Sequence, residues 1–165
     1  MPKLNVAERD EFLREPGILL RIAVVRADGS PLVTPIWFIY EDEAIYFTPR
    51  AKSVWFECLR RDPRVALSID EQAIPYRKVI VEGSAELVHD IGNDDVWRDR
   101  YHRIAERYVG SEGASHYIQN TIEQPRGLYR VAIKSAALMT WRMPESGEAS
   151  MGIWANRYYT PGTDF

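Results

Sequence analysis

The chain has 165 residues, 45% of them hydrophobic and 27% charged, and its formal net charge is −3. This composition is typical of one globular domain with its own core, and the small negative charge excludes a global attraction to nucleic acid or to an anionic membrane. No apolar run approaches the roughly 20 residues that span a bilayer, and residues 1–14 lack a signal-peptide core. One cysteine, Cys58, cannot form an internal disulfide. We therefore expect one cytoplasmic domain over residues 1–165, without a membrane or nucleic-acid partner.

The predicted elements begin with a short helix that Asn5 caps and that ends at residue 14. Strands are then indicated wherever apolar and polar residues alternate or β-branched and aromatic residues gather. Asp28-Gly29 is a hairpin turn between two of these strands. The predicted strands are residues 17–26, 32–40, 44–48, 64–70, 76–88 and 128–141.

Two of the predicted strands are unusually long. We expect a bend at Gly83 in the fifth strand and an interruption at Lys134-Ser135 in the sixth. Apolar residues at helical spacing predict further helices, and the helix that starts at residue 93 is closed by Gly110. These helices cover residues 52–61, 93–110 and 114–123.

Residues 142–165 form a C-terminal tail that is rich in proline and glycine and has no clear period. We expect this tail to be irregular, held in place only where Trp154 and Tyr158-Tyr159 dock on the domain.

The order of elements predicts the fold class. Six mainly antiparallel strands linked by hairpins and short helices favour a small closed barrel. Helices do not alternate regularly with the strands, which excludes a doubly wound parallel sheet. We therefore expect a mainly β (α+β) fold, a six-stranded antiparallel barrel with peripheral helices, and the helix over residues 93–110 outside the barrel.

The loop between the third strand and the next helix has two cations and two hydroxyls, on Thr48, Arg50, Lys52 and Ser53. Backbone N–H groups at a helix start have no partners, and the helix dipole is positive there, so such loops collect anions. Cations at this position are unfavourable by about 0.3–1 kcal/mol unless an anion compensates them. The loop therefore predicts a phosphate site; a solvated loop is the alternative.

Other chemistry finds little support in the sequence. The three histidines, His89, His102 and His116, lack metal-ligand spacing, and no cysteine accompanies them. We expect no metal site, and we expect Cys58 to be a buried, inert thiol. Trp37 on its strand is suited to core packing, to ring stacking or to a dimer contact. No side chain stands out as a general acid, so the catalytic residues stay unknown.

Five segments together resemble a known family. They are the DGSP turn at residues 28–31, the strand that follows it, the hydroxyl and basic loop, the LRRDPRVAL stretch at residues 59–67, and the GSAEL stretch at residues 83–87. In this order they resemble the split-barrel proteins of the pyridoxamine 5′-phosphate oxidase superfamily over about residues 16–87, and the final strand matches in position only. The resemblance implies a split β-barrel homodimer, with flavin mononucleotide (FMN), or alternatively a deazaflavin coenzyme, in a groove between two barrels.

The resemblance also implies binding residues. The backbone of the second strand would lie along the flavin ring, the basic loop would hold the phosphate, and Lys78, with Arg77 as a neighbouring option, would make a further contact. The implied residues are Val33, Thr34, Pro35, Ile36 and Trp37 for the ring, Thr48, Arg50, Lys52 and Ser53 for the phosphate, and Lys78.

The chain departs from true pyridoxamine 5′-phosphate oxidases at the second strand, where Thr34 and Ile39 stand in place of an arginine and a lysine. Arg142 and Arg157 could supply the missing charge, but nothing in their spacing indicates that they reach a binding site. We therefore expect a flavin- or deazaflavin-dependent reductase that transfers a hydride to a small, planar organic substrate and is not a true pyridoxamine 5′-phosphate oxidase. The alternative is a non-catalytic protein that stores or senses flavin, deazaflavin or haem.

Overall fold

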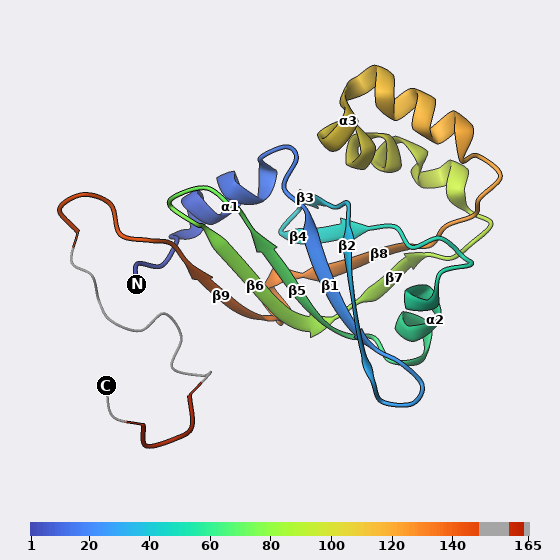
Figure 1. The fold of residues 1–165 in the computed structure, drawn as a ribbon. Coiled ribbons are helices and arrows are strands. Elements are labelled where there is room, and N and C mark those ends of the chain that lie inside the picture. The colour runs from blue at the N-terminus through green and yellow to red at the C-terminus, as the bar shows by residue number, and fades with distance from the viewer. Residues whose placement is uncertain (149–158, 164–165) are drawn as a thin grey trace.

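The computed structural model describes residues 1–148 and 159–163 and contains two antiparallel sheets (Figure 1). One sheet has five strands in the order β2-β1-β5-β6-β9, and the other has four in the order β3-β4-β8-β7. The mainly β, antiparallel class predicted from the sequence is confirmed. The strands are β1 (Leu20–Val25), β2 (Pro31–Ile36), β3 (Ile39–Glu41), β4 (Ala44–Phe47), β5 (Arg64–Asp70), β6 (Lys78–Ser84), β7 (Glu86–His89), β8 (Leu128–Ala132) and β9 (Ala137–Trp141).

The described residues form nine strands where six were expected, because three of the predicted strands break in the middle. The first break, between β2 and β3, falls at Trp37 and Phe38. The second falls at Ala85, between β6 and β7, and the third at the short 3-10 helix η2 (Ile133–Ser135), between β8 and β9. Each break carries the chain from one sheet to the other.

Gly83, near the end of β6, lies close to the residue that precedes β9. A Cβ built on Gly83 would lie 3.1 Å from the Cβ of Ala136, closer than ordinary van der Waals contact. A residue without a side chain therefore allows β6 to approach the start of β9. The strand itself breaks two residues beyond the predicted bend, because the backbone N–H of Ala85 donates to the carbonyl oxygen of Pro63 at 2.7 Å.

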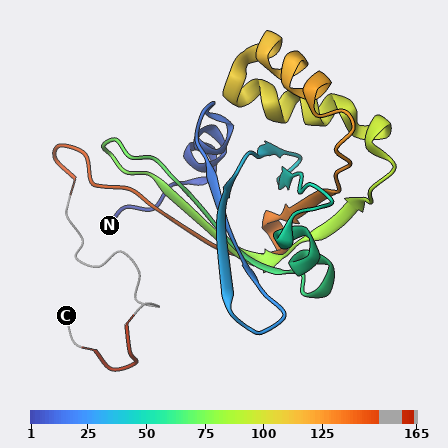
Figure 2. The same ribbon diagram turned by 45° about the vertical axis from the view of Figure 1, so that its right-hand side comes forward.

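One apolar core joins the two sheets with helices α1 (Val6–Arg14) and α2 (Val54–Arg61). Figure 2 shows the two curved sheets with α3 (Arg98–Asn120) standing outside them, as expected. The predicted cap of α1 is confirmed, since the Asn5 side chain accepts from the N–H of Glu8 and the Glu8 carboxylate accepts from the N–H of Asn5. The fully buried core side chains include Phe12, Leu13, Leu20, Ile22, Ile45, Phe47, Leu67 and Ile69.

Helix α3 consists of two halves that fold back on each other at Gly110 (Figure 1). Gly110 has φ 72° and ψ 171°, a backbone conformation open almost only to glycine. The 3-10 helix η1 (Asp94–Trp97) precedes α3. Glu41 on β3 accepts hydrogen bonds from Arg100 (3.1 Å) and from Arg103 (2.8 Å). These ion pairs fix the first half of α3 against the four-stranded sheet.

A second, smaller apolar cluster packs α3 onto the same sheet. It contains Trp97 and Tyr101 from η1 and the first half of α3, and Ile118 from the second half. Their partners on the sheet include Tyr46 and Leu128. The helical hairpin therefore holds aromatic side chains beside the exit of β4, where the basic loop begins.

The C-terminal tail has neither helix nor strand in residues 142–148 and 159–163. The predictions for Trp154, Arg157 and Tyr158 fall outside the described residues. No helix in the described part of the chain is long and apolar enough to cross a membrane.

Candidate functional site

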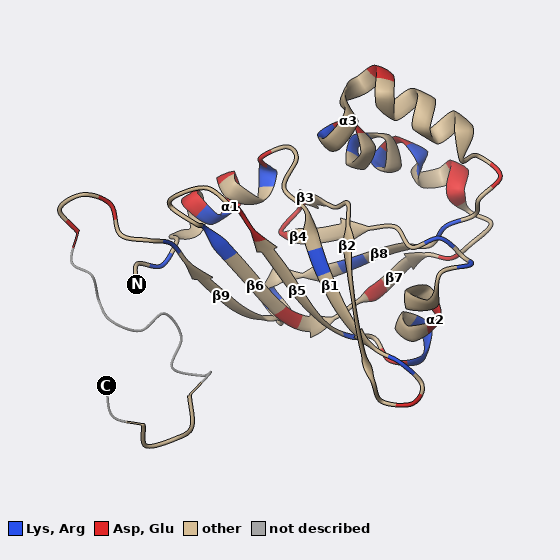
Figure 3. Ribbon diagram, in the orientation of Figure 1, with Lys and Arg blue, Asp and Glu red and all other residues tan. Residues whose placement is uncertain are grey.

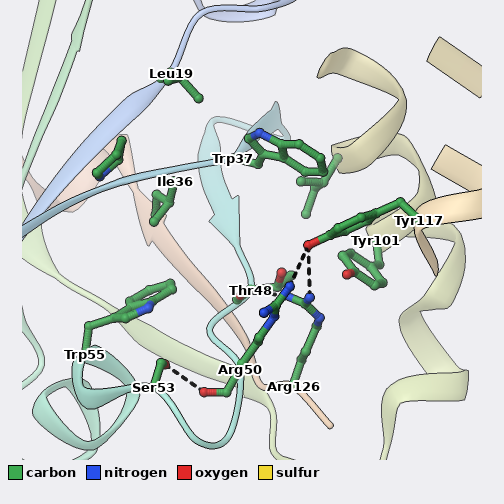
Figure 4. Close-up of a pocket in the computed structure, with 12 residues that line it drawn as sticks. Leu19, Ile36, Trp37, Thr48, Arg50, Ser53, Trp55, Tyr101, Tyr117 and Arg126 are labelled. Atoms are coloured by element: carbon green, nitrogen blue, oxygen red, sulfur yellow. Dashed lines mark hydrogen bonds between the residues drawn. The ribbon is translucent and has the colours of Figure 1, made fainter. Parts of the chain in front are cut away.

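A pocket of about 520 Å³ lies where β2 ends, β4 ends, α2 begins and α3 folds back (Figure 4). Its walls are mainly aromatic and aliphatic, and its polar groups are gathered at one end. The lining residues are Leu19, Pro35, Ile36, Trp37, Thr48, Arg50, Ser53, Trp55, Tyr101, Ile104, Tyr117 and Arg126.

Six of the ten predicted binding residues line this pocket. They come from two separate segments, the end of β2 with its continuation and the loop after β4, which the fold brings together. The six residues are Pro35, Ile36, Trp37, Thr48, Arg50 and Ser53.

The other four predicted residues lie outside this lining. Val33 is 60% exposed on β2, and Thr34 is the next residue of that strand. Lys52 is exposed, because α2 begins only at Val54 and leaves Lys52 in the loop. Lys78 lies on β6 with its Nζ 4.5 Å from the ring centroid of Trp141, so its charge is directed at that indole.

The basic residue that joins Arg50 at the pocket is Arg126, which sequence reasoning missed. Arg50 and Arg126 form an antiparallel β-bridge, so the loop after β4 and the segment before β8 run side by side (Figure 3). The Arg126 N–H also donates to Asp94 Oδ2 at 3.0 Å. In the sequence, Arg126 lies between Pro125 and a glycine and indicates only a helix break.

The two guanidinium groups converge on one oxygen atom (Figure 4). Arg50 Nη2 and Arg126 Nη2 each donate to the hydroxyl of Tyr117 at 3.2 Å. Arg126 is 5% exposed, and its Nη1 donates to the carbonyl oxygen of Thr48 at 3.4 Å. Its Nε is buried without a hydrogen-bond partner. This end of the pocket therefore holds two cations, one of them buried and incompletely hydrogen-bonded.

Neither guanidinium has a carboxylate within 4.0 Å in residues 1–148 or 159–163. Arg126 instead stacks on the ring of Tyr101, with 4.6 Å from its Cζ to the ring centroid. An unpaired buried charge is costly, and a bound anion would remove that cost. Charge and burial thus point to an anion site at Arg50 and Arg126.

The pKa values of the two tyrosines beside this site, Tyr101 and Tyr117, are shifted in opposite directions. Burial raises the pKa of Tyr101 to about 12. Burial also favours the neutral form of Tyr117, but the positive charge of Arg126 and hydrogen bonds from Arg50, Tyr101 and Arg126 outweigh it, so the pKa of Tyr117 lies below its usual value. Tyr117 is therefore the phenol whose ionised form the site stabilises.

Trp37 forms a rigid aromatic wall of the pocket. Its indole is stacked on Tyr108, with ring centroids 5.1 Å apart and planes 4° apart. The Tyr108 hydroxyl donates to the carbonyl of Ile18 at 2.8 Å and accepts from the N–H of Phe38 at 3.3 Å. Tyr117 packs beside Trp37 at 5.0 Å and 55°. A planar ligand therefore meets a fixed ring surface next to the anion site.

A family model described as pyridoxamine 5′-phosphate oxidase matches residues 6–140. The chain belongs to this family. The match extends beyond residues 16–87 and takes in α3, together with β8 and most of β9, where the sequence indicated a match in position only. No curated protein matches the sequence.

Solved structures share the fold of this pyridoxamine 5′-phosphate oxidase family member. A conserved hypothetical protein from Mycobacterium tuberculosis is 25% identical, with a TM-score of 0.65 over 90% of this chain and 94% of that one. An F420 reductase is 27% identical, with a TM-score of 0.58 over 78% and 94%. The haem storage protein HutZ from Vibrio cholerae is 20% identical, with a TM-score of 0.63 over 84% and 96%, and shows the fold alone.

The pocket of this family member contains few groups that could exchange a proton. Among the described lining residues there is no histidine, cysteine, lysine or carboxylate, and the ionisable groups besides the two arginines are the phenols of Tyr101 and Tyr117. No group of three or more metal-ligating side chains is found in the part of the chain that the structure describes. The site is therefore suited to holding a cofactor that carries its own reactivity.

Proposed function

We propose that this chain binds FMN in the pocket between β2, the loop after β4 and α3. Once an external two-electron reductant has reduced the bound flavin, the flavin would transfer a hydride to a small planar organic molecule. The observation that carries the proposal is the pair Arg50 and Arg126. Their guanidinium groups meet at one end of an aromatic pocket, and within the described residues neither forms an ion pair with a carboxylate. The F420 reductase among the similar structures supports a deazaflavin coenzyme as the alternative ligand.

The charges of the anion site fit a terminal phosphate. A phosphomonoester carries about −1.5 to −2 charges at neutral pH, and the two guanidinium groups carry two positive charges. Arginine binds phosphate through parallel N–H donors, and the buried Arg126 Nε has a donor to spare. The lining hydroxyls of Thr48 and Ser53 lie at the same end of the pocket (Figure 4).

The apolar end of the pocket fits a flavin ring. Trp37 would bind one edge of the ring, while Pro35 and Ile36 would orient it along the end of β2. Trp55 and Leu19 narrow the pocket and would exclude water from the reacting atoms. A bound flavin would supply the hydride-transfer chemistry. The chain would orient the ring, exclude water from it and bind the phosphate through the two arginines.

We propose that the substrate is not pyridoxamine 5′-phosphate. That substrate has its own phosphate and would need a second basic cluster beside the flavin. Among the described arginines, Arg107 donates to the carbonyl of Phe38 at 3.0 Å, and Arg142 is paired with Glu148 at 2.6 Å. Both guanidinium groups already have partners, so neither is available to bind a second phosphate. A neutral planar substrate, which needs no further cation, therefore fits this site better.

We also propose a homodimer, formed through the outer face of the five-stranded sheet. Strand register places Val33 opposite Ala23, and Lys78 between Asp70 and Trp141, with all five on that outer face. Val33 is 60% exposed there. A second copy that covers this face would bury Val33 and would bring Lys78 to an interface. The family resemblance implies a homodimer of this kind, with the cofactor in a groove between the two copies.

The second candidate function is storage or sensing of a cofactor without turnover. It is favoured by the scarcity of proton-exchanging groups in the pocket and by the fold shared with a haem storage protein. Steady-state turnover separates the two candidates, because a storage protein would bind FMN but would not reduce a planar acceptor repeatedly.

The test begins with titration of the purified protein with FMN, riboflavin and a deazaflavin coenzyme, followed by absorption and fluorescence. We expect FMN to bind at least about tenfold more tightly than riboflavin, since only FMN has the phosphate that meets Arg50 and Arg126. Equal affinity for FMN and riboflavin would refute the phosphate clamp. Preference for the deazaflavin coenzyme would replace FMN by the alternative cofactor.

A further inference from the structure

The hydroxyl of Tyr117 accepts from both guanidinium groups of the pocket, so it lies where an anionic oxygen would be stabilised. It accepts one hydrogen bond from Arg50 and one from Arg126, each at 3.2 Å. Those two donors come from different segments, the loop after β4 and the segment before β8, and the phenol is their shared acceptor. A phosphate oxygen that lies between the two guanidinium groups would compete with the phenol for these Nη2 donors.

We propose that the Tyr117 hydroxyl competes with phosphate for the two arginines. In the ligand-free protein the hydroxyl accepts hydrogen bonds from both, and it would lose these bonds when a phosphate binds. This inference rests on the proposed phosphate site. It assigns Tyr117 a selective role: a ligand must offer more negative charge than the phenol does. A doubly charged phosphomonoester meets this requirement better than a singly charged phosphodiester or an uncharged ring.

The surroundings of Tyr117 permit such an exchange. Its side chain lies on the second half of α3, beyond the break at Gly110, and it is only partly buried. Tyr101 packs against it edge-on, with ring centroids 6.2 Å apart, and Trp37 lies 5.0 Å away. Displacement of Tyr117 would therefore change the environment of an indole, which gives the exchange an optical readout.

The exchange should depend on pH in a defined direction. The groups that face the Tyr117 hydroxyl are Arg50 from the loop after β4, Arg126 from the segment before β8 and Tyr101 from the first half of α3. Arginine stays charged throughout the working range, and Tyr101 ionises only near pH 12. Ionisation of Tyr117 would strengthen the competitor, so phosphate affinity should fall as the solution becomes alkaline.

The experiment compares Tyr117→Phe with the wild-type chain, using inorganic phosphate as the probe and titration calorimetry with Trp fluorescence as readouts. We expect Tyr117→Phe to bind phosphate at least about fivefold more tightly, because the two hydrogen bonds that the phenol accepts no longer compete with the phosphate. The decline in affinity as the solution becomes alkaline should be present in the wild type and absent in the variant, because phenylalanine has no hydroxyl to ionise. Weaker binding by the variant, or no phosphate binding by either protein, would overturn the inference.

Two controls keep this result distinct from the proposed function. Arg126→Met should abolish phosphate binding, since it removes the cation without leaving a cavity. FMN is titrated in parallel. Wild-type protein that binds phosphate but not FMN would refute the proposed cofactor and leave the role of Tyr117 intact. Tighter FMN binding together with weaker phosphate binding in Tyr117→Phe would overturn the role of Tyr117 and leave the cofactor proposal intact.

Discussion

The indole of Trp37 and the phenol ring of Tyr108 lie face to face, 5.1 Å between centroids and 4° between planes. Trp37 lies at the break between β2 and β3, and Tyr108 lies in the first half of α3. The stack therefore joins the sheet to the helical hairpin at the wall of the pocket. Because the Tyr108 hydroxyl has partners on both sides, the position of Trp37 is fixed by hydrogen bonds as well as by packing.

Tyr108→Phe tests this support. The change keeps the ring stack but leaves the carbonyl of Ile18 and the N–H of Phe38 without their shared partner. We expect the free energy of unfolding to fall by about 1–3 kcal/mol, the cost of stranding buried polar groups. Urea denaturation measures it. Tyr76→Phe, at an exposed tyrosine, is the control and should change the free energy of unfolding little. If Tyr108→Phe lowers the free energy of unfolding no more than this control does, the proposed role of the Tyr108 hydroxyl is contradicted.

Arg126→Met separates ligand binding from stability. The guanidinium of Arg126 is buried and forms no ion pair with a carboxylate in the described part of the chain. An apolar side chain of similar length should therefore leave the ligand-free protein as stable as before or more stable. FMN affinity should fall about tenfold or more, because one charge-assisted contact to phosphate is lost. Thermal melting and FMN titration check the two parts.

Arg50→Ala and Lys52→Ala extend this comparison. Arg50→Ala should weaken FMN binding to a similar degree as Arg126→Met. Lys52→Ala is the matched control, since Lys52 lies exposed in the same loop but outside the pocket, and its removal should change affinity less than about twofold. A strong effect of Lys52→Ala would return the phosphate to the start of α2, where the sequence alone places it.

Gly110→Ala tests the break in α3. With φ at 72° and ψ at 171°, a residue with a Cβ is strained, and we expect a loss of about 1–3 kcal/mol in the free energy of unfolding. Glu112→Ala, at an exposed position of the second half, is the control and should be nearly neutral. If Gly110→Ala is as stable as the control, the two halves of α3 can join into one straight helix.

The ion pairs of Glu41 predict a dependence of stability on pH. The pKa of Glu41 is lowered in the folded state, mainly by hydrogen bonds from Arg103. Burial opposes this shift, and the charge of Arg103 and the contacts of Arg100 add to it. A lowered folded-state pKa stabilises the protein above the unfolded pKa of about 4.3, and this contribution disappears as pH falls through the folded value. The stability difference between wild type and Glu41→Gln should therefore shrink between pH 7 and about pH 3. A difference that is constant over this range would contradict the assignment.

Val33→Glu tests the proposed homodimer. A carboxylate at this exposed position would be buried without a partner if a second copy covers the five-stranded sheet. Light scattering should give twice the chain mass of 19.1 kDa for the wild type and the single mass for the variant. Val6→Glu is the control, since Val6 is 65% exposed on α1 and lies on another element. A monomeric wild type would refute the dimer.

The sequence predicts the strands well because alternation is a local property. All six predicted ranges contain strands, and the cap at Asn5 is where its side chain indicates. The three breaks were harder to locate, since they depend on contacts between distant segments, such as the hydrogen bond from Ala85 to Pro63. The nine strands of the described residues arise from those contacts and not from local preference.

The site was predictable in part for the same reason. Arg50 and Ser53 could be found because a basic loop at a helix start is a local pattern. Arg126 could not, because its role depends on the β-bridge that brings it to Arg50 from a segment 76 positions later. Tyr101 has the spacing of an apolar helix face and predicts only core packing, and Tyr117 becomes functional only when α3 folds back at Gly110.

The three strand breaks have a consequence for how the protein unfolds. Each broken strand contributes one half to each sheet, so neither sheet can separate without pulling strands out of the other. The two sheets should therefore open as one cooperative unit, with backbone amides in β1 and β4 exchanging hydrogen at the same limiting free energy. The second half of α3 shares few core residues with the sheets. Its amides should therefore exchange through a separate opening of lower free energy, which exposes the anion site while the two sheets stay folded.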